Sequence, residues 1–76
     1  MNGRAQAAGV DEKQLTPREF EVAILMAHGH TNQEVADRLV ISVRTAESHR
    51  RNLMAKLSAR SRADVVRWAL DHQLLR

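Results

Sequence analysis

Basic residues are concentrated in one stretch of the chain, residues 42–62, where the only acid is Glu47. This stretch carries a net charge of +5, whereas the whole chain carries +3, so the remainder is mildly acidic. Such an asymmetry is typical of a surface that binds nucleic acid, although a solvated, charged helix face gives the same pattern. The basic residues concerned are Arg44, Arg50, Arg51, Lys56, Arg60 and Arg62.

The apolar spacing in residues 42–58 predicts a helix and indicates which way these charges point. At 100° per residue, Ala46, Leu53 and Leu57 cluster on one side with Arg50 at its edge, so we expect this side to pack on a core. The opposite side is polar. Its candidates for contact with DNA bases are Arg44, Glu47, Ser48 and Arg51.

These outward side chains carry the hydrogen-bonding groups that base recognition needs. Arg51 can donate two bonds to O6 and N7 of guanine, Glu47 can accept one from N4 of cytosine, and Ser48 is compatible with several bases. Polar residues also occur on helix faces that are merely solvated. The local charge and the short connection before this helix favour base contact over that alternative.

One flank of the same helix carries polar side chains that we expect to contact DNA phosphates. His49 is ambiguous there, since a histidine beside a core stripe is commonly a packed, hydrogen-bonded residue. The start of the preceding helix offers free backbone N–H groups and the positive end of the helix dipole, on residues that also act as caps. The candidates for phosphate contact are Thr31, Asn32, Thr45, His49, Asn52 and Lys56.

Capping residues predict where four helices begin. In the first, Thr16 is the N-cap, Pro17 occupies the first helical position and Glu19 follows three residues after the cap. Gly29 is placed to end this helix in a left-handed conformation. The other three starts are marked by Thr31 with Glu34, by Ser42, and by Ser61 with Asp64.

The predicted helices are a first one that ends at Gly29, a second of about two turns, a third over residues 42–58 and a fourth over 62–75. The second and third are joined by only a few residues, which is typical of a helix-turn-helix whose second helix enters the major groove. The predicted fold class is therefore all-α: a four-helix bundle that contains a helix-turn-helix, of the winged-helix-like DNA-binding class without a wing.

Composition limits the class of protein. With 76 residues, 43% of them hydrophobic and 28% charged, we expect one folded domain over residues 15–76 and a flexible tail or linker over 1–14. The chain has no cysteine, which excludes disulfides and thiolate metal sites. No apolar run reaches the roughly 20 residues that span a bilayer and no signal peptide is evident, so the sequence predicts a soluble, cytoplasmic protein without membrane contact.

Catalysis is not expected. His28 and His30 form the only close histidine pair, and no third metal ligand follows at a suitable spacing. The sequence has no glycine-rich phosphate loop and no arrangement of nucleophile, base and orienting acid. We therefore expect neither an enzyme nor a bound cofactor or metal.

Motifs along residues 15–75 form an ordered set. They are Leu15-Thr16-Pro17-Arg18-Glu19, then Gly29, then Thr31-Asn32-Gln33-Glu34-Val35-Ala36, and finally Ser42, Thr45, His49, Leu53, Lys56 and Leu57. In this order and spacing they resemble the LuxR-type (GerE) DNA-binding domain. Such domains lie at the C-terminus of NarL/FixJ-type response regulators and of quorum-sensing regulators.

The resemblance implies a four-helix domain with the third helix in the major groove. It also implies that the fourth helix forms a two-fold dimer contact on paired half-sites. Position by position, it implies base contacts for Glu47, Ser48 and Arg51, backbone contacts for Thr31, Asn32, Thr45 and Lys56, and a capping and internal hydrogen-bonding role for Glu19.

Some positions depart from the family pattern. Ala23 and Ala46 stand where leucine and valine are usual, and Phe20 replaces a polar residue, so we expect a looser core that Phe20 helps to fill. Glu47 occupies a position that is often lysine, and the DNA sequence bound should therefore differ from those of relatives.

The predicted function is that of a sequence-specific transcription regulator that binds double-stranded DNA as a homodimer, with RNA polymerase as a further candidate partner. The alternative is a protein-interaction module of the same fold that contacts another regulator or RNA polymerase. The dimer uses a strip on the fourth helix, and the interaction module uses either that strip or the outward face of the third helix. The residues of the strip are also candidates for the domain's own core. The strip consists of Val65, Trp68, Ala69, His72 and Leu75.

Overall fold

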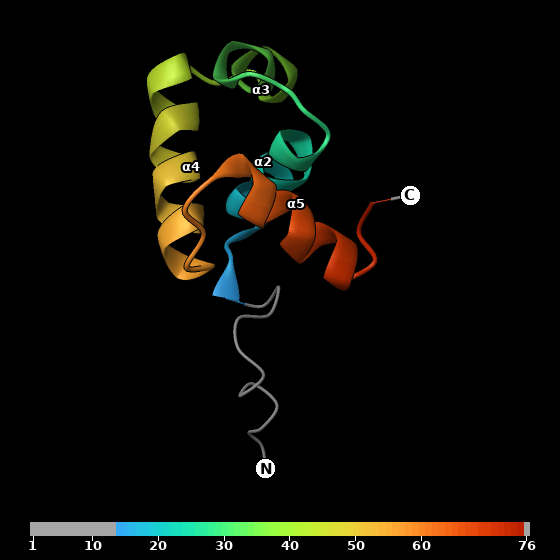
Figure 1. Ribbon diagram of the computed structural model, residues 1–76. Helices are drawn as coiled ribbons and strands as arrows, with labels where there is room; N and C mark the ends of the chain where they lie inside the picture. The colour runs from blue at the N-terminus through green and yellow to red at the C-terminus, as the bar shows by residue number, and fades with distance from the viewer. Residues whose placement is uncertain (1–13, 76) are drawn as a thin grey trace.

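The computed structural model describes residues 14–75, which form four α-helices and no strand. The predicted all-α class and the predicted order of helices are confirmed. Residues 1–13 of the predicted tail lie outside the described range. No helix within residues 14–75 is both long and apolar enough to cross a membrane. The helices are α2 (Pro17–Ala27), α3 (Asn32–Leu39), α4 (Val43–Lys56) and α5 (Arg62–Asp71) (Figure 1).

Side-chain caps begin the first three of these helices. At α2, the Thr16 hydroxyl accepts from the Glu19 N–H (3.1 Å) and the Glu19 carboxylate accepts from the Thr16 N–H (3.0 Å). Thr31 and Glu34 form the same reciprocal box at α3. At α4 the Ser42 hydroxyl accepts from the backbone N–H of the third helical residue, at 3.0 Å. Each cap stabilises its helix by about 1 kcal/mol.

The predicted start of the fourth helix is confirmed, since Ser61 is the N-cap of α5 and Asp64 lies in its first turn. Ser61 precedes α5 in an extended conformation, but its side chain makes no capping hydrogen bond. Instead, a carboxylate oxygen of Asp64 accepts from the backbone N–H of Arg60 at 2.8 Å. The acid in the first turn thus satisfies a backbone donor just before the helix, and the serine does not.

All four helices end in the same way, with one residue in the left-handed conformation. Gly29 does so after α2 (φ 96°), as predicted. At each end, the residue that follows donates its N–H to a carbonyl five residues earlier, the bond of a Schellman motif. The other three left-handed residues are Val40 (φ 57°), Ser58 (φ 55°) and Gln73 (φ 59°).

α2 lies at the centre of the domain and contacts α3, α4 and α5. Its Val22, Ala23 and Met26 are almost completely buried. The ring of Phe20 is half-buried and meets Trp68 of α5 edge to face, with 6.1 Å between ring centroids. Phe20 therefore helps to fill the core beside the small residues of α2, as the sequence predicts.

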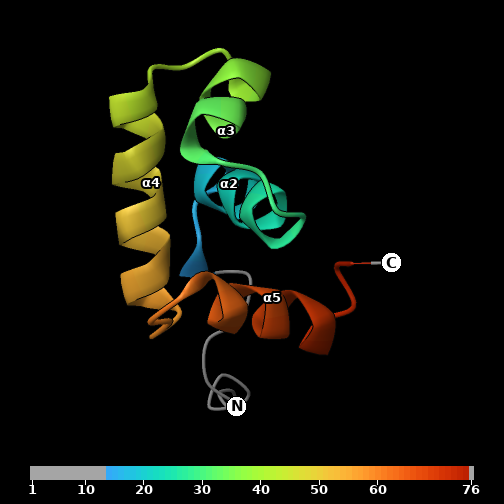
Figure 2. The same ribbon diagram turned by 45° about the horizontal axis from the view of Figure 1, so that its top comes forward.

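α4 stands at one edge of the molecule (Figures 1 and 2). In both views α2 and α3 lie on one side of α4, and no helix covers its other side. Because α4 contacts α2 and α3, its inner side is fixed by packing. The fold thus holds a 14-residue helix rigidly while leaving one face of it open.

Candidate nucleic-acid interface

α3 and α4 form a helix-turn-helix unit. Only residues 40–42 separate the two helices. Val40 turns the chain in the left-handed conformation, and the N–H of Ile41 donates to the Ala36 carbonyl at 3.0 Å. Ser42 then caps α4. This short connection sets the direction of α4 relative to α3, which is how a helix-turn-helix presents its second helix.

The open face of α4 carries the side chains predicted to contact DNA bases. Arg44, Glu47 and Arg51 are exposed, and Ser48 is half-buried. On the opposite side, Ala46 (1% exposed) and Leu53 (0%) lie in the core. The predicted orientation of the helix is confirmed, and contact of these side chains with bases stays a prediction.

The residues predicted to contact phosphates on one flank of α4 differ in their surroundings. Thr45 and Asn52 are exposed, and His49 is half-buried. The Thr45 hydroxyl accepts a hydrogen bond from the Ser42 hydroxyl at 2.9 Å, so it also belongs to the cap of α4. Lys56 Nζ lies 2.7 Å from a carboxylate oxygen of Glu19, and this ion pair gives Lys56 a role within the domain that the sequence did not predict.

Glu19 is the one charged residue in the described core, with 4% of its surface exposed. Burial of the carboxyl group raises its pKa, but the hydrogen bonds from Lys56 and from the Thr16 N–H lower it more, and the net pKa lies below the ordinary value of 4.5. The carboxylate is therefore charged at neutral pH. It joins the first turn of α2 to the last turn of α4.

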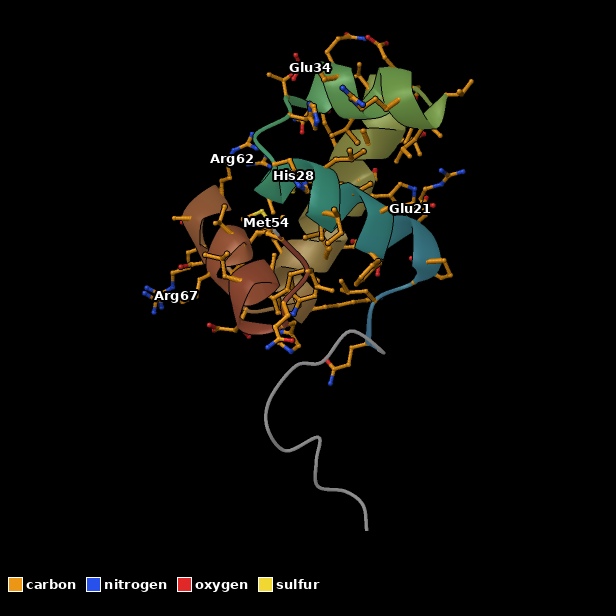
Figure 3. All side chains as sticks on the ribbon, turned by 90° about the vertical axis from the view of Figure 1, so that its right-hand side faces the viewer. Glu21, His28, Glu34, Met54, Arg62 and Arg67 are labelled. Carbon is orange, nitrogen blue, oxygen red and sulfur yellow. The ribbon has the colours of Figure 1, made fainter. Side chains whose placement is uncertain are left out.

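A second internal contact uses another cation of the basic stretch. One guanidinium nitrogen of Arg62 donates to the backbone carbonyls of Met26 (2.7 Å) and His30 (3.0 Å). Arg62 thereby satisfies carbonyls at the end of α2 and places a positive charge at the negative end of that helix. Figure 3 shows its side chain beside the segment that follows α2.

These two contacts narrow the basic surface that the sequence indicated. Lys56 and Arg62 are bonded within the domain. Arg44, Arg51 and Arg60 are exposed. Arg50, at the edge of the core as predicted, is half-buried. Lys56 is exposed but paired, so among the described residues the unpaired positive charge of this stretch lies on α4 at Arg44, Arg50 and Arg51 and at Arg60 in the loop after it.

The predicted phosphate site at the start of α3 is partly occupied by the protein itself. Thr31 is exposed and Asn32 is half-buried, but the Thr31 N–H already donates to the Glu34 carboxylate at 2.9 Å. This bond and the contact with His30, at 3.4 Å, lower the pKa of Glu34. The Glu34 carboxylate therefore already occupies one backbone donor that was predicted to bind phosphate, and contact of Thr31 and Asn32 with phosphate stays a prediction.

Three residues of the strip predicted for dimer contact are buried within the domain, and the dimer contact itself stays a prediction. Val65 and Ala69 are completely buried, and Trp68 is 8% exposed, so all three belong to the domain's own core. His72 and Leu75 are half-buried. The His72 ring lies against Trp68, with 5.5 Å between centroids. The helical spacing of these residues could not distinguish a dimer contact from core packing, because either role requires an apolar side of the helix.

The histidine pair His28 and His30 has partners in the protein. Nδ1 of His28 lies 2.9 Å from the Ile24 carbonyl oxygen, and His30 contacts Glu34. Within residues 14–75, no group of three or more histidine, aspartate or glutamate residues is arranged to hold a metal ion.

Comparison with known proteins identifies the family that this architecture represents. The family model described as "Bacterial regulatory proteins, luxR family" matches residues 13–69. The oxygen regulatory protein NreC of Staphylococcus aureus is 41% identical over 63 residues, which are 83% of this chain and 29% of NreC. The chain thus spans less than a third of this relative.

Solved structures show the same fold. Full-length FixJ from B. japonicum superposes with a TM-score of 0.75 at 36% identity, over 84% of this chain and 32% of FixJ. The DNA-binding domain of Erwinia amylovora RcsB gives 0.75 at 28% identity, over 93% of this chain and 83% of that domain. The Vibrio cholerae LuxR-type receptor VqmA gives 0.73 at 32% identity, over 95% of this chain and 31% of VqmA.

Proposed function

Because the chain belongs to the luxR family of bacterial regulatory proteins and carries that family's helix-turn-helix DNA-binding domain, we propose that it binds specific sequences in double-stranded DNA by inserting α4 into the major groove. One observation carries this proposal: α4 is anchored by Ala46 and Leu53 from behind and turns Arg44, Glu47 and Arg51 toward solvent. A helix of this diameter, about 10–12 Å, fits a groove about 12 Å wide.

The side chains on the open face of α4 suit base recognition in distinct ways. Arg51 has the planar fork that pairs with O6 and N7 of guanine, and Glu47 accepts from N4 of cytosine. Ser48 tolerates several bases. Because Glu47 repels phosphate and pairs with few base edges, it makes the recognised sequence more selective than an all-basic face would.

Exposed Thr45 and Asn52, on one flank of α4, are placed for hydrogen bonds to phosphates, and His49 is less accessible. Lys56 already forms an ion pair with Glu19, so a phosphate that contacts Lys56 would compete with that carboxylate for the ammonium group. These contacts position the protein and carry no sequence information.

The experiment is a selection of bound duplexes from a random pool, followed by fluorescence anisotropy on the selected duplex and on a shuffled one. The proposal predicts a defined site and an affinity that falls with salt, with a slope of about −0.9 per phosphate contacted. A pool that yields no common sequence, or an affinity equal on both duplexes, contradicts it.

A finer part of the proposal is that two copies bind paired half-sites through α5. Leu70, on the exposed side of α5, is a large apolar side chain that is 56% exposed. VqmA, a structural relative, is described as a dimer, which supports the same arrangement. Sedimentation velocity tests it: one copy should bind a duplex with a single half-site, and two copies a duplex with both. A single copy on the paired site contradicts the dimer.

Burial also bears on the alternative of a protein-interaction module. That module would bind its partner through the α5 strip or through the open face of α4, and three residues of the strip are inside the core. The exposed cations of α4 favour DNA over a protein partner. Chromosomal DNA as the partner places the proposed function in the bacterial cytoplasm, with RNA polymerase as a further partner when the regulator is bound at a promoter.

A further inference from the structure

A hollow of about 600 Å³ lies beside the open face of α4. Three elements surround it: the start of α3, one flank of α4 and the loop that leads to α5. The residues that matter for its chemistry are Asn32, Glu47, Arg50, Arg51, Met54 and Arg60. The hollow thus joins residues that are distant in the sequence, and Arg60 was not among the predicted contacts.

The hollow is positively charged. Three arginines line it, against the single acid Glu47. Within residues 14–75, none of these arginines forms an ion pair, whereas Lys56, by contrast, is paired with Glu19. The three guanidinium groups repel one another and the single carboxylate of Glu47 does not balance them, so an anion in the hollow would relieve that repulsion.

Arg50 has a donor that no described protein group satisfies. Its Nε is buried, and no acceptor in residues 14–75 bonds to it. A buried, unpaired donor on a charged group is costly, because the group has lost water without gaining a partner. Beside the open face of α4, Arg50 thus has a hydrogen-bond donor that is free to bind a ligand.

The hollow lies on the side of α4 away from the flank already considered. Glu47 and Met54 line it, and each is two residues, or about 200° around the helix, from Thr45 and Asn52 respectively. A helix inside the major groove has one DNA strand on each side. Thr45 and Asn52 therefore approach one strand, and the hollow approaches the other.

We infer that Arg50 and Arg60, with Asn32 beside them, hold one backbone phosphate of the DNA strand opposite the one that Thr45 and Asn52 approach. The inference rests on the proposed function, since it needs α4 to lie in the groove. Arginine suits this role because its planar fork donates two hydrogen bonds to one phosphate. Clamping α4 from both strands would fix the register in which Arg51 meets the bases.

The test uses the full chain and a duplex with a single half-site, so that dimer formation does not enter. Arg60→Gln is compared with Arg67→Gln, which removes the same charge from an exposed position on α5 that lines a different hollow. Figure 3 shows Arg67 pointing away from the body of the domain. We expect R60Q to weaken binding about tenfold and R67Q to have much less effect. R60Q should also reduce the salt slope by about 1, equally on every sequence.

The phosphate is located by replacing each backbone phosphate of the duplex in turn with a neutral methylphosphonate. At one position this should weaken binding by the wild-type chain and by R67Q, but not by R60Q. Arg50→Lys keeps the charge and loses the planar fork, and it should blunt the effect at that same position. Thermal melting followed by circular dichroism checks that R50K is folded. If R50K is unfolded, the methylphosphonate scan with R60Q alone tests the inference.

The outcomes separate the two proposals. A chain that binds no duplex overturns the proposed function and this inference together. Specific binding in which R60Q behaves as R67Q does, or in which R60Q and R50K affect different phosphates, overturns only the inference. Coupling of both arginines to one phosphate supports it.

Discussion

Lys56 Nζ lies 2.7 Å from the Glu19 carboxylate, and this contact ties the last turn of α4 to the first turn of α2. Glu19 also closes the capping box with Thr16. One buried carboxylate therefore stabilises both the start of the central helix and the position of α4, the helix whose open face we propose to bind DNA. Loss of its charge should affect both.

The first prediction concerns pH. The pKa of Glu19 is lowered in the folded protein, so its charge stabilises the fold above the ordinary value of 4.5, and this contribution is lost as the pH falls through the lower, folded pKa. Glu19→Gln keeps the shape and removes the titration. We expect it to lower the free energy of unfolding by about 2 kcal/mol at pH 7 and to have a smaller effect near pH 3.

Urea unfolding from pH 3 to 7 measures this difference. Lys56→Met and the double variant complete a mutant cycle, in which the double variant should cost less than the sum of the single ones. Glu34→Gln removes another capping-box carboxylate with a lowered pKa, but an exposed one with no lysine partner among the described residues, so it is the control for the capping box alone and its effect should be smaller. A wild-type and a Glu19→Gln curve that stay parallel over this pH range contradict the account.

The second prediction concerns Arg62. Replacing it with methionine leaves the Met26 and His30 carbonyls without their charged donor, which should lower the free energy of unfolding by about 1–3 kcal/mol. Amide hydrogen exchange should speed up at His30 and Thr31, just before α3. Arg38→Met, at an exposed position on α3, is the control. Equal effects of the two substitutions would show that the carbonyl contacts contribute nothing.

The third prediction concerns Val40. This β-branched residue is 87% exposed and adopts the left-handed conformation, which costs roughly 1–2 kcal/mol. Asparagine tolerates that conformation, and replacing the exposed Val40 side chain with it removes no buried apolar contact. Val40→Asn should raise the melting temperature by about 4–8 °C. Val40→Ala keeps a Cβ atom in the strained conformation and should gain less. If Val40→Asn melts at the same temperature as the wild type, the left-handed conformation of Val40 does not destabilise the domain.

The fourth prediction separates the core of α5 from its exposed side. Leu70→Glu should leave the unfolding free energy within about 0.5 kcal/mol of the wild type and abolish two-copy binding on paired half-sites. Ala69→Glu, one residue earlier, places a charge in the core and should unfold the domain. Sedimentation velocity and thermal melting report the two effects. If a folded Leu70→Glu chain still binds paired half-sites as two copies, the exposed side of α5 does not form the dimer contact.

Helix starts could be predicted from the sequence because capping is local chemistry. Thr16 and Thr31 each lie three residues from the glutamate that completes the box, so both partners appear in one short motif. Ser61 also marks the start of α5, but there the Asp64 carboxylate, and not the serine side chain, bonds to the backbone. Of the helix ends, only Gly29 was evident. Val40 and its two counterparts adopt the left-handed conformation although their types do not favour it.

The open face of α4 was also predictable, since the period of Ala46 and Leu53 fixes which side is buried. The internal bonds of Lys56 and Arg62 were not. Their partners lie 32 to 37 residues away, and only the packing of α2 against α4 and α5 brings them together. The charge counted from the sequence therefore overestimated the number of basic side chains that are free to bind DNA, because Lys56 and Arg62 bond within the domain.

The central claim is that Arg51 meets a guanine in the major groove, and one measurement tests it directly. In the selected duplex, each guanine is replaced in turn by 7-deazaguanine, which lacks the N7 acceptor, and anisotropy gives the affinity of the wild-type chain and of Arg51→Ala. We predict that at one guanine the replacement costs the wild type about 1–3 kcal/mol and costs Arg51→Ala almost nothing. Equal losses for both proteins at every guanine, or no loss for the wild type at any, would contradict the claim.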